Sequence, residues 1–174
     1  VARTMSQAGI RLVSPVLFVA TVGEEGVGNL RGVRHLFGVD GAGNDACGFI
    51  SLDGAGHESI VNAGVGSRRY RVTATGPGGH SWADFGLANP LHALGDAIAS
   101  LRRIKPGEGA TLTVGRIAGG TSVNAIPEDV WLEMEVRSTS EARLDSLDQD
   151  VHERLTLAIA DENSRRKKGS AALT

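Results

Sequence analysis

The spacing of apolar residues switches repeatedly between two periods from Ser67 onward, and this switching leaves few folds open to the chain. Alternation with a period of two predicts a strand, and recurrence every 3.6 residues predicts a helix. The predicted strands span 69–74, 111–117 and 130–136, and the predicted helices span 90–104 and 141–160. This β-α-β-β-α order is that of a ferredoxin-like two-layer sandwich. Its last strand is missing, or only begun at residues 171–174.

Asn89 and Pro90 predict where the first of these helices begins. Asparagine is a favoured N-cap, and proline is favoured at the first helical position, where its missing N–H is not needed. We expect the buried stripe of this helix to consist of large apolar residues at helical spacing. Those residues are Leu91, Leu94, Ile98 and Leu101.

The first third of the chain has a different pattern, which predicts a separate domain over residues 1–66, with the sandwich occupying 67–174. Residues 16–22 and 47–52 are short, nearly continuous apolar runs, typical of strands buried on both faces of a parallel sheet. A helix over residues 29–37 is predicted between them. Strand, loop, helix and strand in this order predict part of an α/β domain. The expected fold class is therefore α/β, with a parallel-sheet segment followed by an α+β sandwich.

Charge and composition exclude several classes of function. The net charge is −2, which gives no electrostatic basis for binding nucleic acid or an anionic membrane. The longest apolar run, residues 16–22, is too short to span a bilayer. The single cysteine, Cys47, excludes an internal disulfide framework and a thiolate zinc site, and the reducing cytoplasm is the predicted compartment. The start at Val1 lacks both an initiator methionine and a signal peptide, so we expect a piece of a longer protein.

Acidic residues follow both predicted strands of the first domain. Chemistry in α/β sheets gathers at the carboxyl ends of the strands, and Glu24, Glu25 and Asp53 lie there. Adjacent side chains on an extended loop point in different directions, so one glutamate can bind a metal while the other faces the metal-bound water as a general base. The alternatives are a solvated acidic turn for the glutamate pair and a turn or helix-cap aspartate for Asp53.

Three more polar residues are candidates in the second domain. His80 ends a glycine-rich loop that can bring its imidazole close to a ligand, and the alternative is a surface or core histidine. Asn124 lies in a polar loop, where its amide can donate to a substrate carbonyl or carboxylate, unless it only forms the turn. Arg137 follows the strand at 130–136 and can bind a carboxylate through two hydrogen bonds, or form a surface ion pair.

Four segments resemble one protein family, in the same order and with plausible spacing. Residues 21–29 (TVGEEGVGN) resemble the Glu-Glu segment of co-catalytic zinc peptidases, and residues 76–81 (GPGGHS) resemble the histidine loop that opens their dimerisation, or lid, domain. Residues 119–127 (GGTSVNAIP) and the arginine of residues 135–137 match two further motifs. The resemblance is to metallopeptidase family twenty, which includes aminoacylase, carboxypeptidase G, peptidase T and succinyl-diaminopimelate desuccinylase.

This resemblance implies roles for the acidic residues and a reaction. Glu24 would be the general base, Glu25 a zinc ligand and Asp53 a ligand of the second zinc of a two-zinc centre. The implied reaction is the hydrolysis of an amide bond in a short peptide or an N-acyl amino acid. Between these two kinds of substrate the residues leave the choice open.

The resemblance also implies roles for the lid residues. His80 would reach into the active site of the partner subunit of a homodimer and hold the substrate carbonyl or its oxyanion. Asn124 would assist in substrate binding, and Arg137 would bind the substrate carboxylate.

This sequence departs from the family pattern in its metal ligands. The family's His-x-Asp segment, its bridging aspartate and its C-terminal histidine ligand have no counterpart in it. Since one carboxylate for each metal gives weak binding, we predict that the chain alone is inactive and holds little or no zinc, while the complete protein is active. Two alternatives stay open: a non-catalytic dimerisation module derived from this fold, and an unrelated α/β protein with coincidental motifs.

Overall fold

A computed structural model of the chain describes residues 1–54, 58, 60–62 and 64–174, and the chain divides into two structural units, residues 1–58 and 59–174. Among the described residues, no helix combines the length and the apolar character that crossing a bilayer requires.

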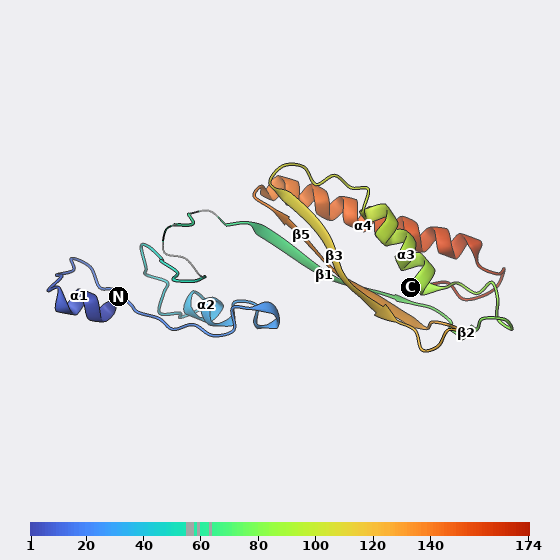
Figure 1. Cartoon of the computed structure of the whole chain (residues 1–174), viewed down its shortest axis with the longest axis horizontal. Coiled ribbons are helices and arrows are strands. Elements are labelled where there is room, and N and C mark those ends of the chain that lie inside the picture. Colours follow the sequence, from blue (N-terminus) through green and yellow to red (C-terminus); the bar gives the residue numbers. More distant parts are fainter. Residues whose placement is uncertain (55–57, 59, 63) are drawn as a thin grey trace. The chain divides into compact units, whose positions relative to one another are not determined.

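The second unit is built on a three-stranded antiparallel sheet in the order β1-β5-β3 (Figure 1). The strands are β1, Gly66–Thr75, β3, Ala110–Gly119, and β5, Asp129–Ser138. β5 pairs with β1 in unbroken register, from Gly66 opposite Ser138 to Thr75 opposite Asp129. Its pairing with β3 shifts between Val114 and Arg116. The three predicted strands of the sandwich are confirmed.

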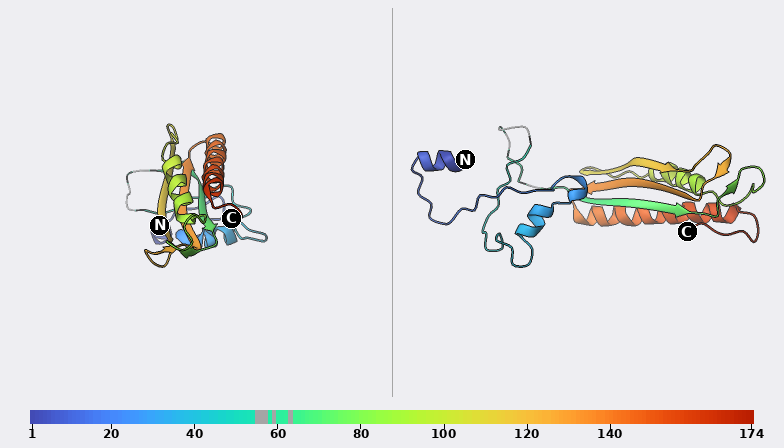
Figure 2. Two further views of the ribbon diagram at one scale, coloured as in Figure 1. Left: turned by 90° about the vertical axis from the view of Figure 1, so that its right-hand side faces the viewer. Right: turned by 90° about the horizontal axis from the view of Figure 1, so that it is seen from below.

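Two helices cover one face of this sheet, as Figure 2 shows: α3, Pro90–Leu101, and α4, Glu141–Arg165. The predicted cap of α3 is confirmed, because the side chain of Asn89 accepts the N–H of Leu91 at 2.9 Å. Ser140 begins α4 in the same way by accepting the N–H of Arg143. Strand order and helix order together give the β-α-β-β-α sandwich that the sequence predicts, so the mixed α/β class is confirmed.

The core of the second unit lies between the sheet and these helices. β5 supplies its centre, because every second residue from Val130 to Val136 faces the helices and is at most 4 % exposed. α4 contributes Leu144, Leu147 and Val151, which are at most 7 % exposed. The other buried members of this cluster are Ala74, Leu94 and Leu101.

The buried face of α3 differs from the predicted stripe at one end. Leu91 is 43 % exposed, whereas Ala93 and Ala97 are buried. Ala93 packs in a small cluster with Ala88 and Leu173. The prediction was wrong here because it weighed large apolar side chains, whereas small residues let α3 approach its neighbours closely.

The C-terminal residues begin the fourth strand of the sandwich. Thr75 and Thr174 exchange two backbone hydrogen bonds, N–H to O, of 2.8 and 3.0 Å, which is the pattern of one antiparallel pair. Asn163 holds the preceding residue, Leu173, through its side chain, with one hydrogen bond to the Leu173 N–H and one to its carbonyl oxygen. The expectation of a last strand only begun at residues 171–174 is thus met by a single pair at the end of β1.

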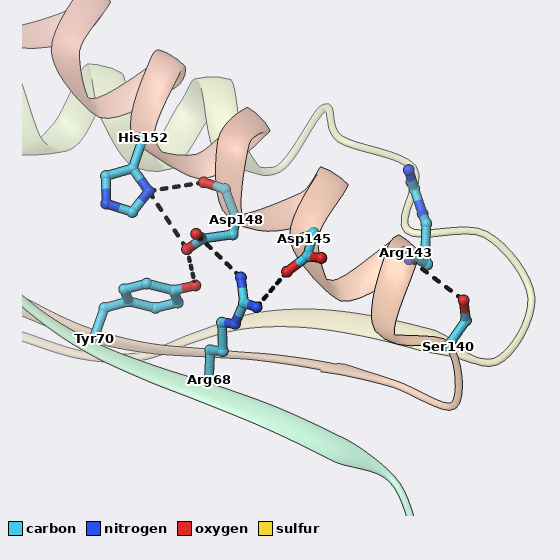
Figure 3. A network of polar contacts seen from close by, with 7 residues as sticks. All are labelled: Arg68, Tyr70, Ser140, Arg143, Asp145, Asp148 and His152. Atoms are coloured by element: carbon cyan, nitrogen blue, oxygen red, sulfur yellow. Dashed lines mark hydrogen bonds and ion pairs between the residues drawn. The ribbon is translucent and has the colours of Figure 1, made fainter.

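A polar network joins β1 to α4 (Figure 3). Arg68 on β1 pairs with Asp145 and, at 3.1 Å, with Asp148, and the Tyr70 hydroxyl donates to Asp148. His152, one turn further along α4, lies with Nδ1 3.4 Å from the Asp148 carboxylate and its ring edge-on to Tyr70. The network fixes α4 over β1 by directional bonds, beside the apolar core.

In its described residues the first unit contains short elements only: α1, Ala2–Gln7, a 3₁₀ turn η1, Gly26–Gly28, and α2, Arg31–Leu36. α2 lies within the predicted helix 29–37, and its N-cap position comes one residue after the predicted start. Leu30 holds that position in a left-handed conformation, without a side-chain cap bond. Phe37 lies edge-on to Phe49, with ring centroids 5.4 Å apart.

The two strands predicted in the first unit do not form. Residues 16–22 and 47–52 have no strand pairing in the part of the chain that the structure describes. Leu17 and Phe18 are 60 % and 54 % exposed, and Ile50 is 87 % exposed. A strand buried on both faces needs a hydrogen-bonded neighbour on each edge and a layer on each face, and the described residues of this unit provide neither.

Candidate functional site

Glu24 and Glu25 lie on a loop that glycines allow to fold back on itself. The carbonyl oxygen of Gly23 accepts the N–H of Arg31 at 3.1 Å, which closes the loop around the pair. At Gly28 a Cβ would lie 2.4 Å from that same oxygen, so only glycine fits there. Both glutamates are exposed at the outside of this loop. The arrangement presents two adjacent carboxylates to solvent.

Asp53 is also exposed, and its carboxylate accepts the N–H of Gly54 at 2.7 Å. This bond joins Asp53 to its immediate neighbour and leaves the choice between a metal ligand and a turn or cap aspartate open. In residues 1–54, 58, 60–62 and 64–174, no three histidine, cysteine, aspartate or glutamate side chains lie close enough to hold a metal ion. Glu24, Glu25 and Asp53 therefore do not form a three-donor metal site in this structure, and the donor set of a two-zinc centre does not fit these residues alone.

His80 and Asn124, separated by 44 positions in the sequence, are brought together by a second small sheet. β2, Gly79–His80, pairs with β4, Ala125–Ile126, so that His80 lies opposite Ala125. The N–H of Ser81 donates to the carbonyl oxygen of Asn124 at 2.9 Å and extends this pairing by one bond. Two of the predicted site residues are thus brought together at this two-stranded sheet, close in sequence to the start of β5.

The His80 side chain is held by the turn that follows it. Its Nδ1 accepts the backbone N–H of Trp82 at 3.2 Å and that of Ala83 at 3.4 Å. The Asp84 carboxylate accepts the backbone N–H of His80 at 2.8 Å, and the Asp84 N–H donates to the His80 carbonyl oxygen at 2.9 Å. The ring is exposed, so its other nitrogen, Nε2, is available to a ligand.

Asn124 is oriented in a comparable way. Its side-chain oxygen accepts the Ser122 hydroxyl, and the Ala125 N–H donates to the Ser122 carbonyl oxygen at 3.2 Å to close the turn. With its oxygen engaged, the amide NH₂ is the group that Asn124 presents as a donor. The side chain is exposed, like that of His80.

Exposed apolar residues lie close to His80 and Asn124 in the sequence. Trp82 is 88 % exposed, Phe85 is 83 % exposed and Val123 is fully exposed. The sequence reasoning missed them, and it missed Asp84. A signal was present, because aromatic residues make up only 4 % of the chain and two of them follow His80 within five positions.

Arg137 lies at the other end of β5. From Asp129 to Arg137 the extended strand covers about 27 Å. Arg137 donates to both carboxylate oxygens of Glu135, at 2.8 and 3.0 Å, and Arg69 donates to one of them at 2.9 Å. The Arg137 and Arg69 guanidinium groups hold the pKa of Glu135 down at about 2, and the carboxylate in turn raises the pKa of Arg137. In this structure Arg137 forms a surface ion pair and is not gathered with His80 and Asn124.

The sheet, its two helices and the His80–Asn124 end can be compared with known proteins. The peptidase dimerisation domain family matches residues 62–162. The chain belongs to that family. The resemblance of the motifs to metallopeptidase family twenty is confirmed with it, since this dimerisation domain is the lid of those enzymes.

Two curated proteins of Bacillus subtilis (strain 168) resemble this dimerisation-domain chain. It is 30 % identical over 116 residues to N-acetyl-L-cysteine deacetylase, a match covering 64 % of the chain and 26 % of that protein. It is 29 % identical over 116 residues to N-acetylcysteine deacetylase, covering 64 % of the chain and 29 % of that protein. The chain therefore spans about a quarter of the length of the curated relatives it matches.

Among solved structures, the dimerisation domain resembles part of a hydantoinase/carbamoylase family amidase from Burkholderia ambifaria. The TM-score is 0.54 at 20 % sequence identity, over 59 % of this chain and 26 % of that one. At this identity the likeness establishes the shared fold.

Proposed function

We propose that the chain is part of an amidohydrolase of metallopeptidase family twenty that cleaves the amide bond of N-acyl amino acids or short peptides. The observation that carries the proposal is the pairing of β2 with β4, which puts the His80 imidazole and the Asn124 amide at one exposed end of a dimerisation domain. Both groups can donate to a carbonyl oxygen. The names of the two curated relatives, both deacetylases of an N-acetylated amino acid, support N-acyl amino acids as the substrate class.

In this proposal residues 1–66 belong to the catalytic domain. Glu24 accepts a proton from the attacking water, and Glu25 and Asp53 belong to the ligand set of a two-zinc centre. When bound, a divalent pair of this kind would lower the pKa of water and polarise the scissile carbonyl. The described residues hold no donor cluster, so in this proposal the rest of the ligand set comes from other parts of the complete protein. We expect the chain by itself to be inactive and to hold little or no zinc.

Residues 67–174 form the lid in this proposal, and the lid makes the protein a homodimer. His80 donates to the substrate carbonyl or its oxyanion in the partner's active site, and Asn124 assists in binding. The exposure of Trp82 and Phe85, which follow His80 in the chain, and of Val123, which precedes Asn124, supports a covered position for this end of the lid, because large apolar side chains are favoured at interaction sites. Arg137 would have to exchange Glu135 for a substrate carboxylate to take its proposed role. The cytoplasm stays the predicted compartment.

A non-catalytic dimerisation module is the second candidate. The lack of a three-donor cluster among the described residues favours it. The exposed pair Glu24-Glu25, on a loop closed by Gly23 and Gly28, favours the enzyme hypothesis.

The complete protein decides between the two. We expect it to release free amino acids from N-acetyl amino acids in the presence of zinc. Glu24→Gln should lower kcat by about 10²- to 10⁴-fold, as the loss of a general base does. His80→Ala should lower kcat by about 10²-fold, as the loss of an oxyanion donor does.

Glu108→Gln, in an exposed loop, is the matched control and should leave kcat unchanged. A complete protein that binds zinc tightly but hydrolyses neither N-acyl amino acids nor dipeptides would contradict the enzyme proposal. Hydrolysis by the 174-residue chain alone would contradict the expectation that this chain is inactive.

A further inference from the structure

The turn at residues 80–84 fixes which nitrogen of His80 carries the proton. Two backbone N–H groups, those of Trp82 and Ala83, donate to Nδ1. A proton on Nδ1 would face both of them, whereas a lone pair there accepts both. The neutral ring therefore carries its proton on Nε2, the nitrogen that can reach a ligand.

Asp84 holds this turn closed. Its carboxylate and its backbone N–H bond to the N–H and the carbonyl oxygen of the same residue, His80, so the two ends of the turn are tied twice. Gly79 leaves the room for this, because a Cβ there would lie 2.8 Å from the Cβ of Asp84. The turn keeps the N–H groups of Trp82 and Ala83 aimed at the ring. Asp84 contacts the backbone of His80, so any effect on the ring is indirect.

We propose that Asp84 is a positioning residue that locks the His80 turn and thereby keeps His80 as an Nε2–H hydrogen-bond donor. In the active site this proton would point at a substrate carbonyl oxygen, a part of the inference that rests on the proposed function. The hydrogen bonds of Asp84 with His80, here called the lock, do not rest on the proposed function, because they are a property of the folded lid.

The lock assigns His80 a donor role and excludes it as a general base in the neutral form. A general base needs an unprotonated nitrogen that can reach the reacting proton, and the unprotonated Nδ1 is occupied by two backbone donors. Proton abstraction is then left to a carboxylate. This division of labour between a histidine donor and a carboxylate base suits amide hydrolysis, in which the carbonyl oxygen gains charge while water loses a proton.

Nitrogen NMR of the folded 174-residue chain tests the lock without any activity. The two ring nitrogens of a neutral histidine have well-separated shifts that reveal which one is protonated, and His80→Gln assigns the signals among the five histidines. With the ring in its neutral form, we expect a single Nε2–H form. Asp84→Ala should move the shifts toward an average of both forms. Asp84→Asn, which can still accept the His80 N–H, should keep the wild-type shifts.

Two further variants guard against a failure to fold. Gly79→Ala places a methyl group against the Asp84 side chain, so it should disturb the same turn and reproduce the Asp84→Ala shifts. Asp96→Ala, on the exposed side of α3, is the matched control and should leave them unchanged. Wild-type shifts in folded Asp84→Ala, or an Nδ1–H form in the wild type, would overturn the proposal.

Kinetics of the complete protein separate this inference from the proposed function. We expect Asp84→Ala to lower kcat about tenfold, with little change in KM, because a misdirected donor is lost chiefly in the transition state. Asp84→Asn should retain the wild-type kcat. If the NMR lock is present but the complete protein hydrolyses no amide, the lock stands and the proposed function fails. If the protein is active and Asp84→Ala changes neither kcat nor the shifts, the lock fails and the proposed function stands.

Discussion

The Tyr70 hydroxyl on β1 donates a hydrogen bond of 2.5 Å to the Asp148 carboxylate on α4. Burial of the phenol and this bond to a carboxylate raise the pKa of Tyr70 to about 12. Since this lies above the ordinary value of 10.0, the neutral phenol stabilises the folded lid fully below pH 10. That stabilisation is lost as the pH rises from 10 to about 12.

Asp148→Asn should lower the Tyr70 pKa toward its ordinary value, because the negative charge that opposes ionisation is removed. Tyr70 is the single tyrosine of the chain, so tyrosinate absorbance during a pH titration reports on it alone. Asp150→Asn, on the same helix, is the control and should leave the midpoint unchanged. An unaltered midpoint in Asp148→Asn would show that the hydrogen bond does not set this pKa.

The ion pair of Glu135 with Arg137 and Arg69 should give the lid an acid-sensitive contribution to stability. The pKa of Glu135 is about 2, below the ordinary 4.5, so its carboxylate stabilises the folded state fully above pH 4.5. This contribution is lost as the pH falls from 4.5 to about 2. Both arginines are about half exposed, 48 % and 60 %, so screening keeps the contribution below about 1 kcal/mol.

Urea unfolding of wild type and Glu135→Gln at several pH values measures this contribution. The two free energies of unfolding should differ most near neutral pH and converge below pH 4. Glu108→Gln, which lies outside the ion pair, should follow the wild type throughout. A difference that grows as the pH falls would have the wrong sign for this ion pair.

Two leucines of α3 should respond differently to truncation. Leu94 is fully buried, so Leu94→Ala should lower the free energy of unfolding by about 2–5 kcal/mol through lost burial and a residual cavity. Leu91 is 43 % exposed, and Leu91→Ala should lower it by only about 0.5 kcal/mol. Chemical denaturation of the two variants provides the comparison. Equal losses of unfolding free energy in the two variants would show that Leu91 is as buried as Leu94, as the sequence predicts.

The outer edge of β3 is the expected place for contact between two lids. β3 pairs with β5 on one side only among the described residues, so its other edge can pair with a second copy. Thr113→Lys should weaken the dimer by at least about tenfold, because symmetric pairing brings like charges together. Thr73→Lys, an equally exposed threonine on β1, should leave it unchanged. Sedimentation at several concentrations measures both, and a wild-type chain that stays monomeric throughout would contradict this use of β3.

The lid was predictable from sequence because its signals are local. Alternation over Val130 to Val136 and the Asn89-Pro90 start each depend on neighbouring residues, and the structure confirms both. The pairing of β2 with β4 could not be predicted in this way, because two-residue strands are too short to show a period. His80 and Ala125 become neighbours only when the whole lid folds. The motifs named both loops as candidates but did not indicate that they touch.

The first unit shows the opposite case. Residues 16–22 have the composition of a strand buried on both faces. Such a strand forms only when neighbouring strands and covering layers are present, and in the structure these apolar residues are exposed. The loop of Glu24 and Glu25 was predictable, since its glycines are visible in the sequence. The metal site predicted for Glu25 and Asp53 stays a prediction, because it depends on how distant segments pack.

The sheet order β1-β5-β3 has a consequence for how the protein is made. Among the described residues, and apart from the single Thr75–Thr174 pair, both outer strands pair with β5, the last of the three to leave the ribosome, so the Gly66–Ser138 pair cannot form before β5 has been synthesised. Until then β1 and β3 emerge as unpaired edges, which are the segments most prone to pair with the wrong chain. The lid should therefore fold late and in one step during synthesis, with a rate limited by the closure of long loops. A nascent chain stalled before Asp129 would be the natural client of a chaperone that binds exposed strands.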